Sequence, residues 1–340
     1  MDQGSAVKLE SGPPAVERST PMAPPCVTGL VARQPGAIAI RCRDASSELC
    51  LSLSFDEEFD TLDLWAPLKR HGRWKTSFAH GPQSGPMAWD SRTLKGNHER
   101  QIYVDPQFPG TGRMSLGVNP FEVKDGVLSI VAQRTSPRTK GYLWGFGFTS
   151  GLLTTERSFA QLYGYFEVRA QLPQGKGLWP AFWLLPAGAT WPPEIDVFEQ
   201  TGGERILQTV HMLRGSAPAE TGFSTQVAGA TREFHTYGVL WTPSRISWFV
   251  DGRETATTPT PAGVNKPMYL LLNLAVGGAL PGDPDATTTW PARLQVDHVR
   301  AYRLSTVPER CGEAPAGLEN LLDGQGHRDP EGAVGDHGEG

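Results

Sequence analysis

The segment "YGYFEVRAQL", Tyr163 to Leu172, alternates apolar and polar side chains with a period of two. One face would carry Phe166, Val168, Ala170 and Leu172, and the other Tyr165, Glu167, Arg169 and Gln171. Strand side chains alternate between two faces, so this pattern is typical of a β-strand that packs one face on a core. The segment therefore predicts a sheet.

Further strand signals fill the middle of the chain. "VKDGVLSIVAQ" and "RISWFVDGRETA" each place an Asp-Gly pair, at 125–126 and 251–252, between runs with strand character. Such pairs favour two-residue hairpin turns. "LQVDHVRAYRL" (Leu294 to Leu304) is typical of a closing strand, and helical periodicity is absent from this zone. We expect an all-β fold, an antiparallel sandwich with long loops over one face.

Composition divides the 340 residues into three zones. Residues 1–50 are rich in Pro, Ala, Ser and Gly and predict a flexible leader, which ends in a first strand at "AIAIRC". Residues 51–305 carry the strand pattern and predict one folded domain. Residues 306–340 have the composition of a disordered tail.

Charge and cysteine usage exclude several classes. The net charge of −5 comes with no basic stripe, so no nucleic-acid partner is expected. No apolar run approaches the roughly 20 residues of a membrane span, and no signal peptide is visible. The four cysteines, at 26, 42, 50 and 311, form no CxxC pair. A Cys42–Cys50 disulfide and reduced thiols both stay open.

A second segment, "WPPEIDVFEQTG" from Trp191 to Gly202, crowds three carboxylates: Glu194, Asp196 and Glu199. On a regular strand the first two would share a face and Glu199 would point the other way. A β-bulge near 197–198 adds one residue to the strand, so Glu199 would turn to the same side as Glu194 and Asp196. The two glutamates would then start about 13 Å apart at Cα, four steps of about 3.3 Å.

Such crowding has a chemical use. A retaining glycosidase needs a nucleophilic carboxylate and a proton-donating carboxyl about 5–5.5 Å apart. A third acidic group between them would keep one neighbour protonated and orient another, so the three would titrate together. Spacing alone leaves a solvated strand edge as the alternative.

Five ordered blocks resemble glycoside hydrolase family 16. They are "YGYFEVRAQLPQGKGLWPAFWLLP", "WPPEIDVFE", "EFHTYGVLWTPSRISWFVDG", "LLLNLAVGGALPGDP" and "WPARLQVDHVRAY". The resemblance runs from about Leu53 to Tyr302 and includes the family's bulged E-x-D-x-x-E form. It implies a concanavalin A-like β-jelly-roll sandwich of two antiparallel sheets with a concave substrate cleft. It also implies Glu194 as nucleophile, Asp196 as its charge-tuning partner and Glu199 as general acid/base.

The resemblance further implies substrate-binding residues: Trp179, Trp183, His211, Asn97 and Glu99. For the two tryptophans the alternative is the sandwich core. For His211 the alternative is a structural histidine, and for the Asn-x-Glu segment it is a solvated loop. Asn273 is expected to be a structural hydrogen-bonding residue in a buried strand.

Many family members carry a structural calcium ion away from the cleft. The matching positions are Glu58, the carbonyl of Gly126, and Asp297, and hard oxygen ligands suit calcium. No cofactor is expected for catalysis.

The resulting functional prediction is a retaining endo-glycosidase that hydrolyses internal β-1,3/β-1,4-type linkages. Laminarinases usually show an Arg in the strand after a TSG-like segment, where this chain has Leu152 and Leu153. The segments "SRTLKGNHERQIYVD" and "WPPEIDVFE" also resemble those of bacterial glycanases that trim exopolysaccharides. A bacterial exopolysaccharide of the succinoglycan type is therefore favoured over storage laminarin, and plain β-1,3- or mixed-linkage β-glucan stays open. The alternatives are a non-catalytic carbohydrate-binding jelly roll and a transglycosylase. We expect a monomer. Its only expected partner is the polysaccharide substrate. The substrate class suggests a secreted or periplasmic location.

Overall fold

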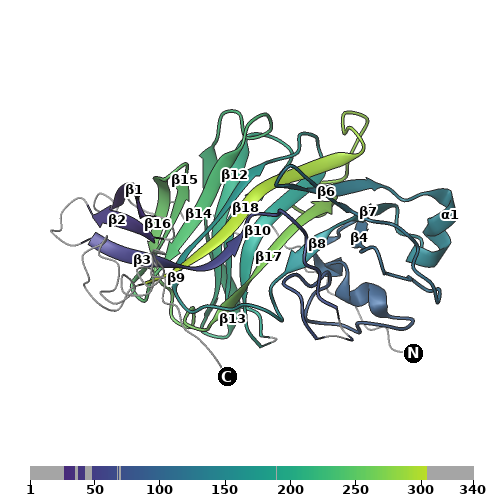
Figure 1. Cartoon of the computed structure of the whole chain (residues 1–340), viewed down its shortest axis with the longest axis horizontal. Coiled ribbons are helices and arrows are strands. Elements are labelled where there is room, and N and C mark those ends of the chain that lie inside the picture. The colour runs from purple at the N-terminus through teal and green to yellow at the C-terminus, as the bar shows by residue number, and fades with distance from the viewer. Residues whose placement is uncertain are drawn as a thin grey trace, which may run out of the picture.

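Two sheets pack face to face in the computed structural model, which describes residues 27–34, 37–42 and 48–304 except 67, 69 and 189 (Figure 1). Side chains are described from residue 51 onward. The prediction of an all-β, predominantly antiparallel sandwich is confirmed, since among the described strand pairs only β4 and β7 run parallel.

The sheet that bears the carboxylates has six strands in the order β13-β12-β11-β10-β17-β8. Its strands are β8 (Leu152–Thr154), β10 (Leu178–Pro186), β11 (Glu194–Gln200), β12 (Arg205–Arg214), β13 (Ala217–Gln226) and β17 (Met268–Val276).

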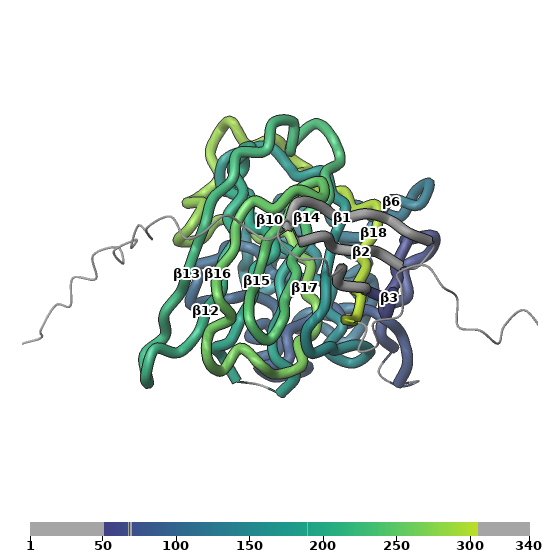
Figure 2. The backbone as a smooth tube through the Cα atoms, turned by 90° about the vertical axis from the view of Figure 1, so that its left-hand side faces the viewer, coloured from purple at the N-terminus to yellow at the C-terminus, as the bar shows by residue number. Residues whose placement is uncertain are grey.

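The opposite sheet has twelve strands, and eight of them follow the order β1-β2-β3-β18-β9-β14-β15-β16. These are β1 (Val27–Gln34), β2 (Ala37–Cys42), β3 (Glu48–Glu57), β9 (Gly164–Gln171), β14 (His235–Trp241), β15 (Arg245–Val250), β16 (Arg253–Pro259) and β18 (Ala292–Leu304). The other four are β4 (Gln101–Tyr103), β5 (Phe121–Lys124), β6 (Val127–Arg134) and β7 (Phe148–Ser150). Figure 2 views the molecule from the end where β1–β3 and β15–β16 lie.

Helical structure is scarce in the described ranges. It comprises α1 (Pro137–Lys140) and the short 3-10 helices η1 (Ala88–Ser91), η2 (Lys95–Asn97) and η3 (Gly141–Leu143). None of the helices among the described residues is long and apolar enough to cross a membrane.

The predicted alternation of β9 is confirmed. Phe166, Val168 and Ala170 are buried in the core between the sheets. Tyr165, on the other face, is also fully buried, in a second cluster that includes Phe249. This part of β9 is therefore covered on both faces.

Both predicted Asp-Gly hairpins are present. The first joins β5 to β6, and the second joins β15 to β16. The φ angles are 53° and 73° at Asp125 and Gly126, and 49° and 74° at Asp251 and Gly252. Two consecutive positive φ values are the signature of the tight turn that glycine and aspartate tolerate.

The N-terminal zone contributes strands to the larger sheet. β2 coincides with the expected "AIAIRC" strand, and β1 pairs with it although no strand was expected there. Because β2 also pairs with β3, the sheet extends into residues 27–42. The leader before residue 27, the tail from residue 305 and the disulfide question at Cys26, Cys42, Cys50 and Cys311 lie outside the described residues or side chains.

Candidate active site

The predicted β-bulge is present in β11. Asp196 pairs with Thr209 of β12 and Glu199 with Leu207, so three residue steps on β11 oppose two on β12. Val197 and Phe198 both enter the core as a result. From Glu194 to Glu199 the partner strand runs four residues, from His211 to Leu207, which matches the four steps expected from the sequence.

A cleft of about 580 Å³ lies over the bulged face of β11. Neighbouring strands supply alternate residues to it, because side chains on a strand alternate between cleft and core. The residues from the six-stranded sheet include Trp179, Ala181, Trp183, Leu185, Glu194, Asp196, Glu199, Leu207, Thr209, His211, Glu220, Asn273 and Ala275. The long connection from β3 to β4 supplies Phe78, His80, Leu94, Asn97 and Glu99. The site therefore combines a strand floor with a loop wall.

The three carboxyl groups face this cleft beside His211. The Nε2 atom of His211 lies 3.0 Å from Oδ2 of Asp196 and 3.7 Å from Oε1 of Glu194. The indole Nε1 of Trp191 donates a 2.8 Å hydrogen bond to Oε2 of Glu194. The bulge thus brings together all three residues of the predicted catalytic set, and it places the predicted His211 next to two of them.

Glu199 has a different neighbour. Nε1 of Trp179 donates a 2.8 Å hydrogen bond to Oε1 of Glu199. The Trp179 ring is fixed by a close main-chain approach, since a Cβ on Gly278 would lie 2.8 Å from the ring and 3.0 Å from the carbonyl oxygen of Asn97. Gly278 has φ of 121°, which suits glycine alone. Trp179 also lines the cleft, and its sugar-binding role stays a prediction.

Burial dominates the electrostatics of the three carboxyls. Desolvation raises the pKa of Glu194, and the charge of Asp196 raises it further, while His211 and the Trp191 N–H oppose this. Burial also raises the pKa of Asp196, with Glu199 adding to the effect. The pKa of Glu199 is raised by burial and lowered in part by the Trp179 hydrogen bond. Three such groups titrate as one coupled set rather than as independent carboxyls.

Trp183 forms part of the cleft floor. It is 7% exposed, and its Nε1 donates a 2.7 Å hydrogen bond to Oδ1 of Asn273. The Nδ2 atom of Asn273 in turn donates to the Tyr103 hydroxyl at 3.0 Å. The structural hydrogen-bonding role predicted for Asn273 is confirmed, and the chain Tyr103–Asn273–Trp183 holds the floor rigid.

The predicted Asn-x-Glu segment lies at the cleft wall. Glu99 accepts hydrogen bonds from the main-chain N–H of Leu94 at 3.1 Å and from Nε2 of Gln101 at 2.6 Å. Burial raises the pKa of Glu99 to about 7. Asn97 is in hydrogen-bond range of Glu99 at 3.5 Å. Both residues line the cleft, so their placement supports the predicted binding role.

Several cleft residues were not predicted as site residues. Trp191 stands at the rim, 56% exposed, although the sequence pattern singled out only its acidic neighbours. Glu220 enters from β13 and contacts His211, with 3.4 Å between Oε2 and Nδ1. Phe78 and His80 come from the loop between β3 and β4 and stack on each other. Of these missed residues, only Trp191 carried a signal in the sequence, because an indole is a flat apolar surface with a polar N–H that suits a sugar ring.

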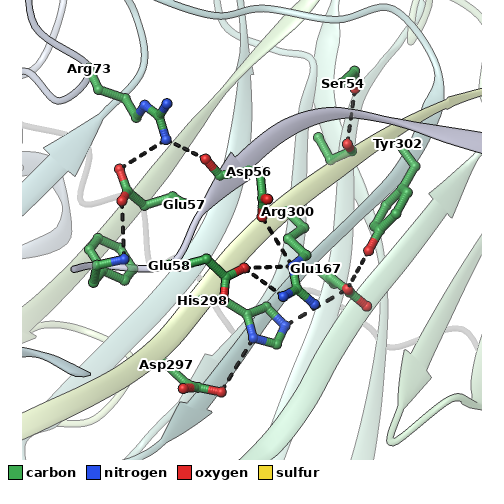
Figure 3. A network of polar contacts seen from close by, with 12 residues as sticks. Ser54, Asp56, Glu57, Glu58, Arg73, Glu167, Asp297, His298, Arg300 and Tyr302 are labelled. Atoms are coloured by element: carbon green, nitrogen blue, oxygen red, sulfur yellow. Dashed lines mark hydrogen bonds and ion pairs between the residues drawn. The ribbon is translucent and has the colours of Figure 1, made fainter. Parts of the chain in front are cut away.

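The three residues predicted to bind calcium lie away from the cleft. Arg300 donates to Oε1 of Glu58 at 2.9 Å, and Arg169 donates to Oδ2 of Asp297 at 2.7 Å; the Glu58, Arg300 and Asp297 side chains appear in Figure 3. A Cβ on Gly126 would lie 3.8 Å from the Glu58 carbonyl oxygen, so these two main-chain segments are adjacent. With each carboxylate paired to an arginine, the side chains do not fit a calcium site as arranged. The calcium ion that the family resemblance implies is therefore not expected at these three residues.

Two glutamates that share a cleft with an aspartate between them form the constellation of a carboxylate-pair glycoside hydrolase. Residues 114–300 match the model of the glycosyl hydrolases family 16. The chain is 42% identical over 256 residues to the endo-1,3-1,4-beta-glycanase ExsH of Rhizobium meliloti, with 75% of this chain and 52% of that protein covered. It is 34% identical over 262 residues to a beta-glucanase of Rhodothermus marinus, with 68% of this chain and 84% of that protein covered.

A solved structure agrees with the sequence comparisons. The laminarinase from Rhodothermus marinus superposes with a TM-score of 0.58 at 32% identity, covering 76% of this chain and 99% of that one. The chain belongs to glycoside hydrolase family 16, and its fold is the jelly roll that the resemblance implied. It spans about half the length of ExsH.

Proposed function

We propose that this protein is a retaining endo-β-glycanase that hydrolyses internal β-1,3/β-1,4-type linkages of a β-glucan or of a bacterial exopolysaccharide of the succinoglycan type. The observation that carries the proposal is the bulge, which turns Glu194, Asp196 and Glu199 toward one cleft. The similarity to proteins named endo-1,3-1,4-beta-glycanase and beta-glucanase supports the linkage types.

In the proposed reaction, the carboxylate of Glu194 attacks the anomeric carbon while Glu199 gives its proton to the departing glycosidic oxygen. The C–O bond to the leaving sugar breaks as the glycosyl–Glu194 ester forms. Water then attacks the same carbon, Glu199 takes its proton, and Glu194 leaves as a carboxylate. Two inversions retain the configuration.

The division of roles follows the family's E-x-D-x-x-E form, because an indole N–H that favours the ionised form contacts each glutamate and does not distinguish them. Glu194 lies beside both the Trp191 N–H and the His211 ring, which favour its ionised form. Asp196 is nearly inaccessible, at 2% exposure, and its position between the glutamates suits a group that tunes them through charge. It is too buried to be offered to a polymer as a nucleophile.

The cleft architecture supports endo action on a sugar polymer. Indole faces can stack on pyranose rings, and the cleft presents Trp179 beside Glu199 and Trp191 beside Glu194. One indole therefore lies beside each of the two glutamates. This arrangement suits a polysaccharide that continues past the cleaved bond in both directions. We propose a monomer, which size-exclusion chromatography with light scattering would test.

The test is a reducing-sugar assay on a panel of β-glucans and bacterial exopolysaccharides with wild type and Glu194→Gln. We expect activity on one polymer class and a loss of several orders of magnitude in the variant. A wild type that binds polymer without cutting it would favour the binding-module alternative. Product analysis at high acceptor concentration separates hydrolysis from transglycosylation, since a sugar hydroxyl can replace water in the second step.

A further inference from the structure

Three side chains form a row across the cleft floor. Glu194 of β11 pairs directly with His211 of β12, and His211 pairs directly with Glu220 of β13. Directly paired residues of antiparallel strands point to the same face, with Cβ atoms about 5 Å apart. The row therefore starts at the proposed nucleophile and ends at a glutamate on the outermost strand of the sheet.

The imidazole of His211 bridges the row through both of its nitrogens. Nε2 lies 3.0 Å from Asp196 and 3.7 Å from Glu194, and Nδ1 lies 3.4 Å from Oε2 of Glu220. A half-turn of the ring would move Nδ1 away from Glu220 and Nε2 away from the β11 carboxyls. A neutral imidazole has one N–H, and the partner of one nitrogen decides which nitrogen carries it.

We propose that Glu220 is a positioning residue of the active site: its carboxylate holds the Nδ1 edge of His211 and thereby keeps Nε2 directed at Asp196 and Glu194. The effect of Glu220 on catalysis rests on the proposed function. The contact between Glu220 and His211 is independent of it. Among the described residues no lysine or arginine forms an ion pair with Glu220, so no competing cation draws its carboxylate away from His211.

The carboxyl groups around His211 determine which pKa values change when the charge of Glu220 is removed. The groups facing His211 are Glu194 and Asp196 from β11 and Glu220 from β13, with Glu199 further along β11. The negative charge of Glu220 raises the pKa of Glu199 and of Asp196. Neutralising Glu220 therefore lowers the pKa of the proposed general acid. The alkaline limb of the pH–rate profile should move to lower pH.

The experiment compares Glu220→Gln with a matched control, Asp251→Asn. Asp251 is a carboxylate of similar exposure, 51% against 53% for Glu220, and it also contacts a histidine, with 2.7 Å between its Oδ2 and Nδ1 of His235. It lies in the hairpin between β15 and β16, on the opposite sheet.

For Glu220→Gln we expect kcat to fall about tenfold with KM little changed. We also expect the alkaline limb to move down by about half a pH unit, the size expected from a partly solvated charge within about 10 Å. The control should leave kcat and both limbs as in wild type. A pH profile for Glu220→Gln that matches wild type and control would overturn the proposal.

A second readout is independent of activity. Nitrogen-15 NMR of the imidazole rings, assigned with His211→Gln, reports which ring nitrogen of His211 carries hydrogen. Glu220→Ala should change the His211 signals and leave those of His235 unchanged, at a melting temperature near that of wild type. Unchanged His211 signals would contradict the positioning role. If wild type cuts no polymer, the proposed function fails while this measurement still decides the contact.

Discussion

The indole N–H of Trp179 donates a 2.8 Å hydrogen bond to the carboxyl group of Glu199. One residue thus offers an aromatic face to the cleft and a polar contact to the proposed general acid. Trp191 has the same relationship to Glu194, with its own 2.8 Å bond. Each of the two glutamates is paired with its own tryptophan, which couples sugar binding to the protonation of the catalytic carboxyls.

Trp179→Phe should keep the ring and remove the donor. The Trp179 hydrogen bond lowers the pKa of Glu199, so its loss raises that pKa and moves the alkaline limb of the kcat/KM profile to higher pH. A hydrogen bond to a charged group contributes about 1.5–3 kcal/mol, so a shift of about one to two pH units is expected. The measurement is the pH dependence of kcat/KM.

The control for this variant is Trp144→Phe. Trp144 also donates through Nε1, at 2.9 Å to the Pro86 carbonyl, and it does not line the cleft. The Trp144→Phe variant should leave the pH profile of kcat/KM unchanged. An alkaline limb that stays in place in Trp179→Phe, or moves to lower pH, would contradict the role given to the Trp179 contact.

His298 on β18 predicts acid sensitivity of the fold. Burial lowers its pKa to about 4, and the charge of Arg300 adds to this, despite the neighbouring Asp297 (Figure 3). Between the unfolded value of about 6.5 and this folded value, the unfolded state binds the extra proton. Stability is therefore full above about pH 6.5 and falls as the pH drops toward 4, by at most about 3 kcal/mol.

Denaturant unfolding of wild type and His298→Gln between pH 7 and 4 measures this effect. The variant should lose less stability over that range than wild type. The exposed His71 provides the control, and His71→Gln should follow the wild-type curve. If the free energy of unfolding of His298→Gln falls with pH as steeply as that of wild type, other groups cause the acid sensitivity.

Divalent-ion removal tests the calcium prediction. We expect EDTA to leave the melting temperature unchanged, because Arg300 and Arg169 already neutralise the carboxylates of Glu58 and Asp297. A matched titration with magnesium and calcium after dialysis is the control. A melting temperature that falls on chelation and recovers with calcium alone would show that the ion implied by the family resemblance binds here.

The sequence predicted the parts of the fold that depend on local patterns. The period-two alternation around Phe166 and the Asp-Gly turns at 125–126 and 251–252 each determine a conformation within a few residues. The bulge was also predictable, because only an extra residue turns Glu199 toward Glu194 and Asp196. These features depend on chain geometry and not on distant contacts.

The parts that were missed depend on long-range pairing. Glu220 lies in "APAETGFSTQ", whose mixed polar pattern gives no sign that this residue pairs with His211. The wall that contains Phe78 and His80 comes from a loop without periodicity. The burial of Tyr165 on the outer face arises from Phe249 and Tyr302, which join it only after folding. No local pattern encodes such neighbours.

The most direct test of the central claim is to trap the glycosyl–enzyme intermediate. A 2-deoxy-2-fluoro β-glucan oligosaccharide with a good leaving group slows the second step, and peptide mass spectrometry locates the sugar. We predict one adduct, on Glu194, absent from Glu194→Gln and formed in Glu199→Gln with the activated substrate. A stable adduct on Glu199, or hydrolysis with inversion of configuration, would contradict the account.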